Sequence, residues 1–141
     1  MAAPAKATGP GAVRGGLWFL AVGATAAATH LLVFAAAQQR MWPELANAAG
    51  FVVAFFVSFH GHRLLSFPDA ATTARQSLAR FAAVALAGFA SNEAVFTLLL
   101  RGAGWPALAA LVVALAVAAG QTFYSAGTGR SGADEPSGRG L

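Results

Sequence analysis

Four long apolar stretches dominate this chain and constrain its fold more than any other feature. They cover residues 16–37, 43–67, 78–100 and 105–124. A helix needs roughly 20 apolar residues to cross the hydrocarbon core of a bilayer, and each stretch is near that length. The sequence therefore predicts an all-α membrane protein with four transmembrane helices, flanked by short flexible tails at residues 1–15 and 125–141.

The composition argues against a water-soluble fold. Only 10% of the residues are charged and 57% are hydrophobic, whereas an average soluble domain is about 25% charged. Cysteine is absent, which excludes a disulfide framework and a thiolate metal site. The net charge of +4 comes from basic residues scattered between apolar runs. We therefore expect anionic lipid, and no nucleic acid, as the partner for this charge.

The first apolar stretch shares two features with a secretory signal peptide. Lys6 and Arg14 precede it, and three alanines at residues 35–37 resemble a cleavage site. The stretch is longer than the roughly 7–15 residues of a signal core, and three similar stretches follow it. We therefore expect it to be kept as a membrane helix.

The basic residues predict the orientation of the helices, because cytoplasmic loops carry an excess of Lys and Arg. With the N-terminus inside, seven of the nine basic residues lie on the cytoplasmic side: Lys6, Arg14, Arg63, Arg75, Arg80, Arg130 and Arg139. Trp18 and Tyr124 then lie at the inner interface, and Trp42 and Trp105 at the outer one. The sequence predicts an N-in/C-in protein of the cytoplasmic (inner) membrane.

The two halves of the chain are similar to each other. The pair Trp42-Pro43 recurs as Trp105-Pro106, and residues 29–34 align with residues 91–96. In both halves a proline follows an interfacial Trp, where its missing N–H does not disturb the start of a helix. The similarity predicts two helical hairpins arranged as a parallel repeat. Chance matching between helices rich in Ala and Leu is the alternative.

Polar residues at membrane depth are costly and usually face a bundle interior or a polar cavity. Glu93 lies in the middle of the third stretch, and His30 lies at a similar depth in the first. One hypothesis is that the two residues share a cavity and exchange a proton or bind a substrate hydroxyl. The alternative is that Glu93 is protonated and bonded to a neighbouring helix while His30 packs. The candidate cavity residues are Glu93, Asn92, His30 and Asn47.

A second cluster lies at the inner end of the second stretch. His60 and Arg63 are three residues apart and share a helix face, bracketed by Phe56 and Phe67. A guanidinium binds phosphate in a bidentate manner, so Arg63 and His60 are the candidate site for a lipid phosphate. The alternative is that Arg63 only anchors the topology by snorkelling. His60 and His62 point roughly 200° apart on a regular helix, so we expect no metal site.

Signatures of soluble catalysis are missing from the sequence. It has no phosphate-binding glycine loop, no supported Ser/His/Asp arrangement and no paired carboxylates. We therefore expect no enzyme activity and no cofactor.

Several residues follow a pattern found in a known family. An early Asn in the second stretch is followed by Ser-Phe, an Arg and a final Phe: Asn47, Ser58, Phe59, Arg63 and Phe67. The second half adds Arg80, Phe81, Gly88 and Asn92. In these residues the chain resembles the GtrA-like family of small four-span membrane proteins, over about residues 17–124. His62 stands where the family usually has Asn, Leu65 stands where Trp is common, and residues 121–127 lack the second Arg-rich ending.

The resemblance implies a role in cell-surface polysaccharide or glycolipid synthesis. We expect membrane translocation (flipping) of a polyprenyl-phosphate-linked sugar, with the phosphate at Arg63 and His60 and the sugar along the candidate cavity residues. One alternative is a non-transporting adaptor that recruits a membrane glycosyltransferase, and another is a small proton-coupled exporter. Four short helices make a narrow bundle, so we expect a homo- or hetero-oligomer.

Overall fold

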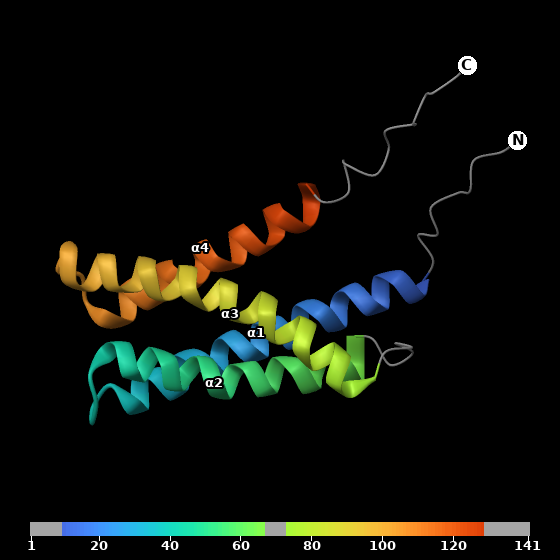
Figure 1. Cartoon of the computed structure of the whole chain (residues 1–141), viewed down its shortest axis with the longest axis horizontal. Coiled ribbons are helices and arrows are strands. Elements are labelled where there is room, and N and C mark those ends of the chain that lie inside the picture. Colours follow the sequence, from blue (N-terminus) through green and yellow to red (C-terminus); the bar gives the residue numbers. More distant parts are fainter. Residues whose placement is uncertain (1–9, 67–72, 129–141) are drawn as a thin grey trace, which may run out of the picture. The chain divides into compact units, whose positions relative to one another are not determined.

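The computed structural model describes residues 10–66 and 73–128, and all regular structure in these ranges is helical. The helices are α1 (Pro10–Ala37), α2 (Pro43–Gly61), α3 (Ala74–Thr97) and α4 (Ala107–Thr128), as Figure 1 shows. Two π-helical segments, η1 (His62–Ser66) and η2 (Leu98–Gly102), continue α2 and α3. The chain forms two compact units, Met1–Ala85 and Leu86–Leu141, whose boundary falls within α3.

Three of the helical stretches are long and apolar enough to cross a bilayer. They are Val13–Ala37, Pro43–Leu65 and Arg75–Gly102. The fourth apolar stretch, Ala107–Gln121, is shorter, and at about 1.5 Å per residue it reaches about 22 Å of a roughly 30 Å core. The all-helical membrane class is thereby confirmed. The fourth crossing and the N-in/C-in orientation stay predictions.

The helices extend beyond the apolar stretches. The first helix begins at Pro10, six residues before the start predicted at residue 16, so part of the expected N-terminal tail is helical. Proline suits the first turn of a helix because its φ angle is already helical. The last helix likewise runs to Thr128, past residue 124. The remaining residues of the two expected tails, 1–9 and 129–141, lie outside the described residues.

In the first unit, α1 and α2 run antiparallel, side by side, as a hairpin (Figure 1). Two glycines of α2 allow this close approach. A Cβ atom at Gly50 would lie 2.5 Å from Cδ2 of His30 and 2.8 Å from the carbonyl oxygen of His30. A Cβ atom at Gly61 would lie 2.7 Å from Cγ1 of Val22. Small residues at such contacts let membrane helices gain van der Waals packing. Gly50 and Gly61 therefore allow α1 and α2 to pack closely at two places along the hairpin.

In the second unit, the chain reverses between η2 and α4 (Figure 1). The amide N–H groups of Ala103 and Trp105 donate to the carbonyl oxygens of Leu98 and Leu99 and close the turn. Gly104 has a φ angle of 68°, in the left-handed region that glycine adopts without steric cost. Trp105 and Pro106 follow, and α4 starts at the next residue.

Burial agrees with the alignment of the two halves. His30 aligns with Asn92 and Phe34 aligns with Phe96, and all four side chains are buried. A duplicated hairpin would bury the same positions in each copy, so this pattern supports the repeat, which stays a prediction. The aromatic residues expected at the interfaces are all exposed: Trp18, Trp42, Trp105 and Tyr124.

Candidate functional site

His30 and Asn47, two of the candidate cavity residues, meet inside the hairpin. Nε2 of His30 lies 2.8 Å from Oδ1 of Asn47, and the two residues are 4% and 0% exposed. An amide oxygen only accepts hydrogen bonds, so Nε2 of His30 carries the proton and donates. The contact joins α1 to α2 beside Gly50. It has the geometry of an interhelical packing bond, and a transport role for His30 stays a hypothesis.

Asn92 and Glu93 belong to the second unit. Asn92 is buried and Glu93 is half-buried, because neighbouring residues of a helix point about 100° apart. The hydroxyl of Thr97, one turn further on, donates to Oε1 of Glu93 at 3.4 Å. A carboxyl group is therefore present in the middle of the third candidate span, with one oxygen bonded to its own helix. The shared cavity of Glu93 and His30 stays a hypothesis.

Arg63 lies in η1, the π-helical end of the second candidate span. Its guanidinium is half-buried, and Nη1 donates to Oγ of Ser77 in the first turn of α3 at 3.3 Å. Thr73 precedes α3, and its Oγ1 accepts from the backbone N–H of Gln76 at 3.3 Å, as an N-terminal capping residue does. The start of α3 therefore lies beside η1 and fixes the position of the Arg63 guanidinium.

His60 is exposed, and its ring bonds its own helix. Nδ1 of His60 lies 2.9 Å from the carbonyl oxygen of Phe56, so Nδ1 donates and Nε2 is the ring nitrogen left for a ligand. In the part of the chain that the structure describes, His60 and Arg63 thus bond to different elements. Phe67, expected to bracket the pair, lies outside the described residues.

The expected regular helix across this cluster is wrong, because α2 ends at Gly61 and η1 starts at His62. A π-helical turn has i→i+5 hydrogen bonds and wider spacing, so α-helical angles do not apply beyond Gly61. Segments of this kind often occur at functional sites. Within the described ranges, no three side chains of His, Asp or Glu gather as a metal site would require.

Aromatic side chains form a cluster around His62 that was not predicted from the sequence. The His62 ring stacks on Phe19 of α1 with centroids 4.6 Å apart, and its centroid lies 6.1 Å from that of Phe81 in α3. Phe55 and Phe59 of α2 also contact Phe81, at 5.4 and 5.7 Å. Part of the signal was available, because Phe55 and Phe59 are four residues apart on one face of α2. The cluster joins the start of α3 to the hairpin beside Arg63.

Comparison with known proteins agrees with these features. Residues 18–127 match the family model described as GtrA/DPMS, transmembrane domain. No curated protein and no solved structure shows significant similarity to the chain. The match covers both units, including Asn47, Arg63 and Asn92, and confirms the resemblance to the GtrA-like family. The chain therefore belongs to the GtrA/DPMS transmembrane-domain family, whose members serve polysaccharide or lipid-linked sugar synthesis in membranes.

Proposed function

We propose that this protein translocates a polyprenyl-phosphate-linked sugar across the membrane and binds the phosphate at Arg63. The observation that carries the proposal is the half-buried guanidinium of Arg63 at the end of a candidate span, held by Ser77. Because the Ser77 contact already orients the guanidinium, less side-chain entropy is lost when a phosphate binds to it. The family match supports a substrate of this chemical class.

The donor count of Arg63 leaves capacity for a phosphate. A guanidinium has five N–H donors in a planar fork, and the described contact uses one of them on Ser77. Two parallel N–H donors can therefore reach two phosphate oxygens, which is the geometry that favours Arg over Lys. His60 adds a second contact through Nε2, which donates only when the imidazole is cationic.

The sugar path is proposed along the polar residues at membrane depth. Asn92 and Glu93 of the second unit offer an amide and a carboxyl group to sugar hydroxyls, whereas the buried His30–Asn47 bond of the first unit joins the two helices of the hairpin. We propose that the protein lies in the cytoplasmic membrane with both termini inside, so that Arg63 lies at the cytoplasmic interface. A homo- or hetero-oligomer, including a partner glycosyltransferase, widens the narrow path. No enzyme activity of its own is proposed.

The test is a flipping assay in proteoliposomes with a fluorescent polyprenyl-phosphate sugar. Arg63→Lys keeps the charge and removes the bidentate fork, so we expect at least about a tenfold loss of initial rate at low substrate, the equivalent of one charge-assisted hydrogen bond. Arg40→Lys, a control at the opposite end of the hairpin, should keep the wild-type rate. Full activity of Arg63→Lys together with loss in Arg63→Ala would show that Arg63 acts only as a topology anchor.

A further inference from the structure

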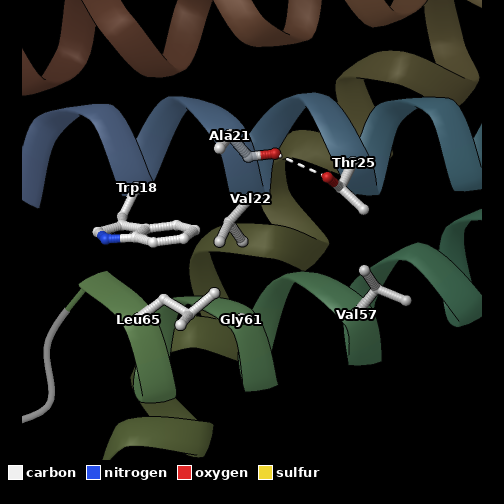
Figure 2. Close-up of a pocket in the computed structure, with 7 residues that line it drawn as sticks. All are labelled: Trp18, Ala21, Val22, Thr25, Val57, Gly61 and Leu65. Atoms are coloured by element: carbon white, nitrogen blue, oxygen red, sulfur yellow. Dashed lines mark hydrogen bonds between the residues drawn. The ribbon is translucent and has the colours of Figure 1, made fainter.

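A groove lies between α1 and the α2–η1 segment of the first unit. Its volume is about 160 Å³, and the lining residues are Trp18, Ala21, Val22, Thr25, Val57, Gly61 and Leu65. Figure 2 shows the Trp18 ring and the Leu65 side chain at one end, and Thr25 and Val57 at the other. Val22 points from α1 toward Gly61 between them. The groove therefore starts at the interfacial end of the hairpin and runs into the membrane.

The chemistry of the lining suits hydrocarbon. The one hydroxyl of the groove, that of Thr25, donates to the carbonyl oxygen of Ala21 at 2.8 Å (Figure 2), so it offers no donor to a ligand. All other lining side chains are apolar except for the indole N–H of Trp18. An apolar cavity of roughly 150 Å³ accepts a molecule of six carbon atoms. The groove thus has room for one segment of a lipid chain, and the indole N–H of Trp18 is the one donor that its lining side chains offer to a ligand.

A basic residue continues the α1 wall of the groove toward the water. Arg14 precedes Trp18 by one helical turn, so the two side chains share a face of α1. Side chains of a helix lean toward its N-terminus, and Arg14 is exposed. Its guanidinium therefore lies beyond Trp18, about 6 Å further along the axis, at the depth of lipid headgroups.

We infer that this groove is a binding site for an anionic phospholipid of the bilayer. One acyl chain of the lipid lies between α1 and the α2–η1 segment. The Trp18 ring covers the part of this acyl chain that is nearest to the headgroup, and Arg14 binds the phosphate. The complementary charge of Arg14 and the apolar lining identify this occupant. The site uses neither Arg63 nor His60, so it does not depend on the proposed translocation of a sugar lipid.

The test uses the fluorescence of Trp18 in the full-length Trp42→Phe/Trp105→Phe background, with brominated lipids as quenchers. One basic contact predicts about fivefold stronger apparent binding of brominated phosphatidylglycerol than of brominated phosphatidylcholine. Arg14→Gln should remove this preference while leaving the quenching by phosphatidylcholine unchanged. Arg40→Gln, the matched control at the other end of α1, should keep the preference.

A second pair of variants tests the groove itself. Ala21→Phe fills it and should remove the preferential quenching, whereas Ala27→Phe, at an exposed position about 120° around α1 from Ala21, should not. Equal quenching by the two wild-type lipids, a preference that survives Arg14→Gln, or unchanged quenching in Ala21→Phe would overturn the site. Stronger displacement of the brominated lipid by undecaprenyl phosphate than by unbrominated phosphatidylglycerol would overturn the phospholipid as its occupant.

Discussion

Replacing Gly50 with alanine perturbs the tightest contact described between α1 and α2. The added methyl group would lie 2.5 Å from Cδ2 of His30 and 2.8 Å from the carbonyl oxygen of His30. A rotated imidazole can relieve the first clash, but the second involves backbone, so the helices must separate. Separation also stretches the 2.8 Å bond between His30 and Asn47. Gly50→Ala is therefore expected to destabilise the hairpin.

The magnitude follows from three opposing contributions. Overpacking costs about 1–3 kcal/mol, and a weakened interhelical hydrogen bond adds roughly 0.6–1.7 kcal/mol. Alanine recovers about 0.5–1 kcal/mol because it loses less backbone entropy than glycine in a helix. The net loss is about 1–4 kcal/mol in the free energy of unfolding, which is a roughly 5–900-fold shift of the folding equilibrium.

The assay is unfolding by SDS titration in mixed micelles, followed by circular dichroism. Gly23→Ala is the matched control, because a Cβ atom at Gly23 has nothing within 4 Å. The free energy of unfolding of this variant should rise by up to about 1 kcal/mol, because alanine loses less backbone entropy than glycine when a helix forms. If Gly50→Ala is as stable as Gly23→Ala, the proposed close contact between the two helices is refuted.

Three further predictions concern the hairpin and its orientation. Gly61→Ala should destabilise through its contact with the Val22 side chain, and Val22→Ala should rescue part of the loss, with a coupling of about 1 kcal/mol in a double-mutant cycle; strict additivity would contradict the contact. Asn47→Leu leaves a buried imidazole N–H without its acceptor, so the free energy of unfolding should fall by about 1–2 kcal/mol; a gain in stability would contradict that role of the amide. Because the chain has no cysteine, single cysteines report topology directly: an impermeant thiol reagent on intact cells should label Gln39→Cys and spare Gln76→Cys, and the reverse pattern would overturn the N-in orientation.

The sequence was sufficient to predict the helical membrane class, because each helix carries its own apolar signal. The helix ends were harder to place. Residues 10–15 are rich in glycine and resemble a linker, yet α1 starts at Pro10. The π-helical segments η1 and η2 could not be predicted either, because hydropathy does not distinguish a π-turn from an α-turn.

In the candidate site too, features of a single helix could be predicted from the sequence, whereas contacts between helices could not. Arg63 and His60 were identified from their spacing on one helix, but Ser77 was missed, because its contact depends on how α3 approaches η1. His30 and Asn47 were identified separately, and their hydrogen bond depends on the rotation of two helices. Gly50 lies three residues after Asn47 on the same face, which was the available sign of a close approach.

The most direct test of the proposed function is the flipping of a polyprenyl-phosphate sugar by this chain alone. The purified wild-type protein is reconstituted into vesicles without a glycosyltransferase, and the accessible fluorescent lipid is measured with time. A translocator should move lipid between the leaflets well above the rate in protein-free vesicles, and Arg63→Lys should lower that rate. A wild-type rate equal to that of protein-free vesicles, with the fold verified by circular dichroism, would contradict translocation and favour the adaptor.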